Sequence, residues 1–158
     1  MTDTKIEKLR IHLSQMEEYI PKFEVINKSV SKVSVGWQLD HCLKVINGVI
    51  KTMSKSNPQE YKRNFNLSRM ILFGLNFIPR GKAKSPKVVL PPETILKQDL
   101  LKQLLKAKDL LEGIEQLQDT NHFKHLIFGT LSKKQTLRFL DLHTHHHLKI
   151  VRDILEFQ

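Results

Sequence analysis

The sequence predicts an all-α protein built as a helical bundle, and three observations support this fold class. Apolar residues recur at spacings of three and four in four long segments, which is typical of amphipathic helices; these segments lie within residues 3–20, 34–55, 91–117 and 132–158. Proline, glycine or asparagine residues separate them. Strong strand signals are absent, so we expect an antiparallel bundle with one shorter extra helix near 66–77 and a Pro-rich loop at 79–92.

The first two helices have clear apolar faces and clear ends. Pro21 ends the first helix, whose face is formed by Ile6, Leu9, Leu13 and Met16. After a connector, Ser34 is a candidate N-cap for the second helix, which should run to about Lys55. The face of this second helix is formed by Leu39, Cys42, Ile46, Val49 and Met53.

The remaining elements are bounded by turn and capping residues. Pro91 and Pro92 can open the fourth helix, because proline is tolerated in a first turn. This helix should run to about Leu117, with an apolar face formed by Leu100, Leu104, Leu111 and Ile114. Residues 118–131 are expected to be a connector, and Val88 to Leu90 a short extended piece of the preceding loop. Ser132 and Gln135 form a capping-box pattern at the start of the last helix, which can run almost to Gln158.

Composition points to a single globular domain over residues 1–158. Apolar residues make up 40% of the chain and charged residues 27%, a balance that is unlike a disordered protein. One cysteine, Cys42, cannot form a disulfide within the chain and suits a reducing cytosol, so a cytoplasmic protein is expected. The start lacks the apolar stretch of a signal peptide, and the longest nearly apolar run, residues 70–78, is about half of a membrane span.

Positive charge is concentrated in one quarter of the chain. The net charge is +10, and residues 51–90 carry nine basic residues against one acidic residue. Such a field can recruit nucleic acid, a membrane surface or an acidic metabolite, although a solvated lysine-rich loop is the alternative. A membrane partner is not expected, because the longest nearly apolar run is too short for a membrane span. A nucleic-acid partner is not expected either, because no recognition helix is evident and the aromatic residues of this segment are few. Those residues are Tyr61, Phe65, Phe73 and Phe77, of which the last two are expected in the core.

Eight histidines are many for this length, and two of them interrupt the apolar face of the last helix. That face follows positions 140, 143, 147, 150, 154 and 157, so His143 and His147 should point inward. Spacing i, i+4 is how a helix presents two ligands to one metal ion. His41, on the second helix, is the candidate third ligand, and three imidazoles with an open fourth position are typical of catalytic metal sites.

Other interpretations of these residues stay open at this point. The cluster at 143–147 could be a solvated group, or His143 and His147 could be hydrogen-bonded core residues. Cys42 could replace His41 as a soft ligand, although its place on the apolar face favours a buried small hydrophobe.

Three motifs resemble the DinB/YfiT-like superfamily and together extend over nearly the whole chain. The segment from Ser34 to Cys42 is similar to its tryptophan-to-histidine motif on the second helix, and the segment from His143 to Lys149 is similar to its final-helix motif. The segment from His125 to Ser132 resembles the loop before the last helix in one branch of unknown function, where His-Pro-x-Phe-Gly is usual. Leu126 replaces that proline, and Ile150 stands where many relatives carry glutamine.

This resemblance implies a four-helix bundle with up-down-down-up connectivity that is often dimeric. It also implies a divalent metal, commonly zinc or nickel, held by His41, His143 and His147. The side chains that support the ligands or line the pocket would be those of Trp37, His125, Phe128 and His146, although helix-start packing is an alternative role for Trp37.

Characterised members of the superfamily include thiol-dependent S-transferases and a mycothiol-dependent isomerase. The resemblance therefore implies a small-molecule substrate and a low-molecular-weight thiol that is activated as a thiolate. Such thiols are anionic, so Lys82, Lys84 and Lys87 are candidates to guide them to the site.

Two other functions are weaker alternatives. Metal-dependent hydrolysis would need a carboxylate base, for which Asp40 and Asp141 are near in sequence but poorly placed on their helices. A non-catalytic stress-related or DNA-associated module would rest on the basic 51–90 segment alone.

Overall fold

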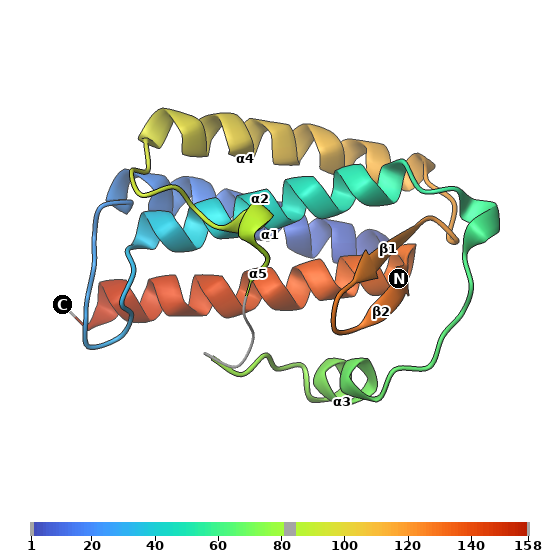
Figure 1. The fold of residues 1–158 in the computed structure, drawn as a ribbon. Helices are drawn as coiled ribbons and strands as arrows, with labels where there is room; N and C mark the ends of the chain where they lie inside the picture. The colour runs from blue at the N-terminus through green and yellow to red at the C-terminus, as the bar shows by residue number, and fades with distance from the viewer. Residues whose placement is uncertain (1, 81–84, 158) are drawn as a thin grey trace.

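The chain is mostly helical, as the sequence predicts (Figure 1). The computed structural model describes residues 2–80 and 85–157. Its four long helices pack side by side, with α1 and α2 each lying against both α4 and α5. In Figure 1, α1 and α5 run from right to left, whereas α2 and α4 run from left to right. The long helices are α1 (Thr2–Tyr19), α2 (Val35–Ser54), α4 (Lys97–Glu112) and α5 (Lys133–Glu156).

The core forms where the apolar faces of these helices meet. Every apolar position predicted for the first, second and fourth helices is buried. On α5, the predicted positions Leu140, Ile150 and Ile154 are buried as well. Phe157 is the exception: it follows the last turn of α5 and is 68% exposed, so its assignment to the core is wrong.

Both predicted N-caps are confirmed. The hydroxyl of Ser34 accepts a hydrogen bond of 3.2 Å from the backbone N–H of Trp37. Ser132 and Gln135 form the full capping box, in which each side chain accepts from the backbone N–H of the other residue. These caps fix where α2 and α5 begin.

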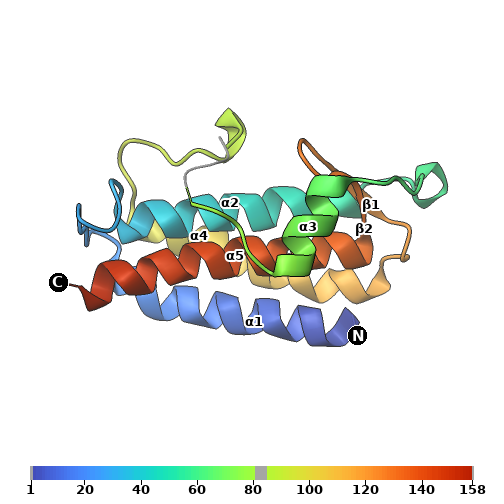
Figure 2. The same ribbon diagram turned by 90° about the horizontal axis from the view of Figure 1, so that it is seen from below.

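A fifth helix, α3 (Leu67–Leu75), lies across α5 outside the four long helices (Figure 2). Asn66 caps its start, and Asn76 ends it in the left-handed conformation at φ 53°. Phe73 is partly buried and packs on the core, but Phe77 is 57% exposed. The expectation that Phe77 belongs to the core is therefore wrong, because Phe77 follows the end of α3 and is not part of its buried side.

The segment before α4 differs from the prediction. The helix begins at Lys97 rather than at Pro91. Pro91 itself precedes a proline, which disfavours the helical conformation at that residue. Leu96 provides no side-chain cap, and a 3₁₀ turn at Gly113–Gln116 follows the helix. Residues Lys87–Val89 form another 3₁₀ turn, so the extended piece expected at 88–90 is also wrong. Two further 3₁₀ turns are Ile20–Lys22 and Pro58–Glu60.

A β-hairpin replaces the connector expected at 118–131. Strands β1 (His122–His125) and β2 (Gly129–Ser132) pair in antiparallel register, with His125 opposite Gly129. Gly129 adopts φ 71°, a conformation that side-chain-bearing residues rarely take. The hairpin leads directly into α5 and places His125 near the histidines of that helix.

Within the described part of the chain, no helix combines the length and apolarity that crossing a membrane requires.

Candidate metal centre

Three histidines from two helices converge inside the protein. His41 lies on α2, and His143 and His147 lie one turn apart on α5. One nitrogen from each ring can be chosen so that all three lie within 4.8 Å of one another. The ring centroids are separated by 4.6 to 5.2 Å. The structure therefore brings together the three residues selected from the sequence as a group that could hold a metal ion.

Hydrogen bonds determine which nitrogen two of these rings can offer. Nδ1 of His41 donates to the backbone carbonyl of Val89 over 2.9 Å, and Nδ1 of His147 donates to Oε1 of Gln38 over 2.6 Å. Carbonyl and amide oxygens only accept, so both Nδ1 atoms carry the proton in these contacts. The Nε2 lone pairs of His41 and His147 are therefore free to bind a cation, and metal-binding histidines usually have their second nitrogen held in this way.

His143 has a different environment. Its Nδ1 is buried, and no hydrogen-bonding partner for it lies among the described residues. The ring packs near Phe139, with the two ring centroids 5.5 Å apart. Leaving a buried polar nitrogen unpaired costs about 1–3 kcal/mol, so the ring is suited to a site where a ligand completes its bonding.

All three imidazoles favour the neutral form. Burial lowers the pKa of each ring, and the neighbouring histidines lower the pKa of His143 and His147 further. For His41, the hydrogen bond to Val89 and the nearby Asp40 oppose this effect only in part. Neutral imidazole is the form that binds metal ions, so no ring needs to lose a proton at neutral pH before binding one.

The loop after α3 covers the His41 side of the cluster. Besides the Val89 carbonyl, the carbonyl of Leu90 accepts from Nζ of Lys44 over 3.1 Å. Oγ of Ser85 lies 3.5 Å from Nε2 of His41, at the limit of hydrogen bonding. This places a hydroxyl group on the side of the ring whose lone pair is free.

The predicted neighbours of the three histidines form two groups, one in direct contact with them and one connected to them through Phe139. Trp37 stacks on His41 with ring centroids 5.3 Å apart, and His146 lies edge-on to His147 at 5.0 Å. His125 and Phe128, from the hairpin, stack on each other at 4.5 Å and reach the cluster through Phe139.

Nδ1 of His125 accepts hydrogen bonds from the backbone N–H groups of Ile127 and Phe128. Its proton therefore sits on Nε2. Burial lowers the pKa of His125 to about 4, so this ring is also neutral at neutral pH.

Only one of the three predicted anion-guiding lysines can be located. Lys87 is exposed on the 3₁₀ turn that carries Val89, so its position is compatible with that role. Lys82 and Lys84 lie outside the described residues.

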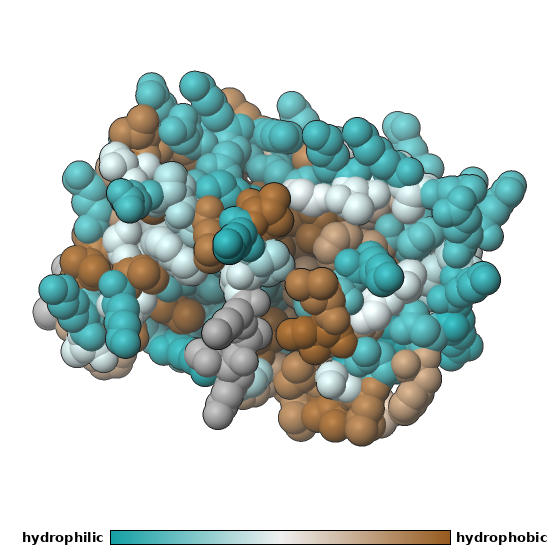
Figure 3. All heavy atoms as spheres, viewed as in Figure 1, coloured by the Kyte–Doolittle hydropathy of each residue, from teal (hydrophilic) through white to brown (hydrophobic). Residues whose placement is uncertain are grey.

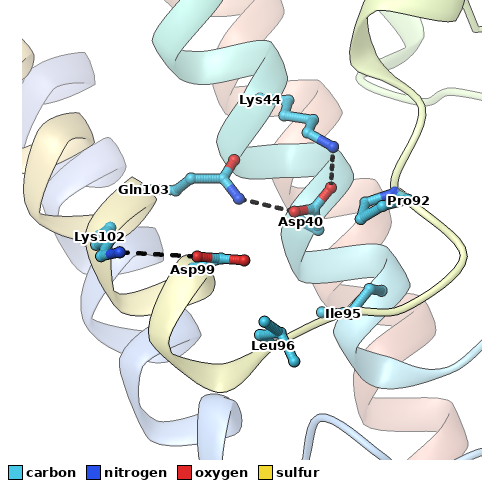
Figure 4. Close-up of a pocket in the computed structure, with 8 residues that line it drawn as sticks. All are labelled: Asp40, Lys44, Pro92, Ile95, Leu96, Asp99, Lys102 and Gln103. Atoms are coloured by element: carbon cyan, nitrogen blue, oxygen red, sulfur yellow. Dashed lines mark hydrogen bonds and ion pairs between the residues drawn. The ribbon is translucent and has the colours of Figure 1, made fainter.

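Neither candidate carboxylate base faces the histidine cluster. Asp40 is turned toward α4, where its carboxylate pairs with Lys44 and accepts from Gln103, each over 2.7 Å (Figure 4). Asp141 pairs with His12 of α1 over 2.9 Å. Both carboxylates are engaged elsewhere, so the site itself consists of neutral nitrogen ligands.

Three contributors to the site were not identified from the sequence: Gln38, Ser85 and the carbonyl of Val89. Gln38 was detectable in principle, since it lies one turn before His41 and is a polar residue on a face that must be buried. The other two depend on the path of a loop, which spacing along the chain does not determine.

Comparison with known proteins adds a family but no function. A family described as "Protein of unknown function (DUF1569)" matches residues 5–154. Neither the curated proteins nor the solved structures contain a match to this chain.

Proposed function

The chain belongs to the DUF1569 family, and we propose that it is a metal-dependent enzyme that transfers a small thiol to an electrophilic substrate. His41, His143 and His147 would hold one divalent ion, with zinc or nickel as the expected metals.

The observation that carries this proposal is the convergence of three neutral imidazoles without a fourth protein ligand. Among the described residues, no carboxylate or thiol joins the group. Closed structural sites for zinc use four protein ligands, whereas catalytic sites use three and keep one position for water or substrate.

The spacing of the nitrogens fits such an ion. Nitrogens bound to tetrahedral zinc at about 2.1 Å lie roughly 3.4 Å apart. The nitrogens here lie within 4.8 Å of one another, so small side-chain rotations would bring them to this spacing. The hydrogen bonds to Val89 and Gln38 hold two rings in the tautomer that binding requires.

Thiol chemistry suits the surroundings of the site better than hydrolysis does. When bound, the ion would supply Lewis acidity that favours the thiolate form of a thiol. In the transfer, a sulfur–carbon bond forms while the leaving group departs with its bonding pair, and the thiol proton passes to solvent. Lys87 could attract the anionic thiol, and Trp37, which stacks on His41, could form part of the wall of the thiol-binding pocket. Hydrolysis ranks second because Asp40 and Asp141 are engaged elsewhere.

The fold supports the same proposal. We infer that α1, α2, α4 and α5 form the up-down-down-up four-helix bundle of the DinB/YfiT-like superfamily, in agreement with the helix directions in Figure 1. The three motifs that resemble this superfamily supply the converging histidines and the adjoining hairpin. A homodimer and a cytosolic location stay predictions from the sequence and the resemblance.

Metal analysis of untagged protein tests the site. We expect about one divalent ion per chain, lost in the variant His143→Ala/His147→Ala. The control is His145→Ala, which removes an exposed histidine of the same helix and should leave the metal in place. Equal metal content in the wild type and the double variant would refute the proposed site.

Activity assays then separate the two chemistries. The metal-loaded protein is mixed with an alkylating electrophile and, in turn, with several low-molecular-weight thiols. Loss of the electrophile only when thiol is present supports transfer, whereas loss in buffer alone indicates hydrolysis. Full activity in the double variant would contradict both.

A further inference from the structure

The outer side of α3 is a large exposed apolar surface. Leu126 is 84% exposed, Phe65 80% and Leu75 67%. Figure 3 shows this apolar surface at the lower right, where Figure 1 places α3 and the hairpin. We refer to it as the α3 face, which consists of Phe65, Leu67, Met70, Ile71, Leu75, Phe77, Leu126 and Ile127. Exposed apolar patches of this kind usually mark an interaction site.

The α3 face is held rigidly. Asn66 donates to the carbonyl of Ile127 over 2.8 Å, and Nη1 of Arg69 donates to the carbonyl of Phe128 over 3.0 Å. These bonds join the start of α3 to the tip of the hairpin. Nη2 of Arg138 on α5 donates to the carbonyl of Phe73, which fixes the other end. Because the inner side of α3 already packs on the core, its outer side is exposed in the ordered protein.

The segments that form this face carry no negative charge. Residues 61–77 and residues 122–132 contain no aspartate or glutamate, while they contain four lysine and arginine residues. Among these residues, Lys62 and Arg63 lie three and two residues before Phe65, and Lys124 lies two residues before Leu126; all three are exposed. The α3 face is therefore an apolar surface in cationic surroundings.

We propose that the α3 face binds the surface of membranes that contain anionic phospholipids. Interfacial binding combines apolar side chains that enter the headgroup boundary with basic side chains that attract anionic lipid. It requires no spanning helix, which agrees with the helices described here. The expectation from the sequence that no membrane partner exists considered spanning segments and charge, and did not foresee this exposed face.

Charge favours lipid over the other occupants of the face. A second copy of the chain would bring the same cationic residues into one contact, with no carboxylate from these two segments to compensate them. Nucleic acid would meet the charge, but only two of the eight side chains of the α3 face, Phe65 and Phe77, are aromatic, and the other six offer no surface for base stacking.

Vesicle sedimentation with the full-length protein tests this proposal. We expect binding to phosphatidylcholine vesicles that contain roughly one-third phosphatidylglycerol, weaker binding at high salt, and little binding to pure phosphatidylcholine. The variant Phe65→Ser/Leu75→Ser should bind at least about tenfold more weakly. The matched control is Leu105→Ser, since Leu105 is 62% exposed on α4, on the far side of the molecule from α3.

A second variant keeps the test decisive if the apolar substitutions disturb folding. Lys62→Glu/Arg63→Glu changes only exposed side chains and should also weaken binding to anionic vesicles. Absence of binding by the wild type, or equal binding by the wild type and both variants, overturns the proposal. It is also overturned if light scattering shows a dimer that Phe65→Ser/Leu75→Ser dissociates and Leu105→Ser does not, because a second copy then covers the face.

Discussion

Oε1 of Gln38 accepts a 2.6 Å hydrogen bond from Nδ1 of His147, joining α2 to α5 at the histidine cluster. Gln38 is almost fully buried, so few other partners could take its place. The contact holds the ring of His147 in one orientation and leaves its Nε2 lone pair available. His41 receives the same support from a backbone carbonyl, which substitution cannot remove directly. Gln38 is thus the side chain through which this support can be tested.

We predict that Gln38→Leu weakens binding of a divalent ion by about 10–100-fold, because His147 loses the acceptor that orients it. Competition with a chromophoric chelator measures the affinity, and the far-UV circular dichroism spectrum checks the fold. Gln98→Leu is the control, since Gln98 is exposed on α4. Unchanged affinity in Gln38→Leu would show that the contact does not support a ligand.

His125 should make the stability of the protein depend on pH. Burial lowers its pKa from 6.5 to about 4 in the folded state. Between these two pH values, the unfolded chain binds a proton at His125 that the folded chain does not bind. The free energy of unfolding is therefore unaffected by His125 above pH 6.5, and it decreases as the pH falls toward 4.

We predict that His125→Asn has a shallower loss of unfolding free energy over this pH range than the wild type. Asparagine keeps an acceptor for the N–H groups of Ile127 and Phe128 but does not titrate. The difference in slope is at most about 1.4 kcal/mol per pH unit, and solvent screening reduces it. Urea denaturation at several pH values measures it, and parallel curves for the two proteins would contradict this role of His125.

The helices and the histidine cluster could be predicted because both follow from spacing on a helix. The periodic face of α2 was predicted from Leu39 to Met53, and all of its members are buried. His143 and His147 occupy two positions of the apolar face of α5, so the spacing that predicts the core also predicts that both side chains point inward, where they meet His41. His41 was then selected as a residue able to face them.

What could not be predicted depends on pairing between segments. The sequence His122–His125 shows no alternation and no β-branched residue, so the strand depends on its pairing with Gly129–Ser132. Phe77 was assigned to the core on its apolar character alone, which does not show whether a residue beyond the end of a helix is covered by another segment. Val89 contacts His41 only because the loop after α3 returns to α2.

We predict that Arg69→Met destabilises α3 by about 2–4 kcal/mol, because buried carbonyl groups lose a charged donor. Arg69 is buried and donates to the carbonyls of Asn64, Phe128 and Thr130. Hydrogen exchange of the amides of α3 and the hairpin should increase, while the amides of α1 and α4 keep their protection. Unchanged exchange across α3 would show that the other contacts of this helix hold it in place without Arg69.

Two glycine-to-alanine substitutions should have effects of opposite sign. At Gly129, φ is 71° and a Cβ atom would lie 2.6 Å from Oδ1 of Asn64, so Gly129→Ala should destabilise the protein by about 1–3 kcal/mol. Gly48 lies inside α2, and a Cβ atom there would meet nothing within 4 Å. Gly48→Ala should therefore stabilise the protein by about 0.5–1 kcal/mol, because alanine loses less conformational entropy in a helix. Thermal unfolding of both variants measures these effects, and a tolerated alanine at 129 would mean that the hairpin turn has more freedom than its backbone angle indicates.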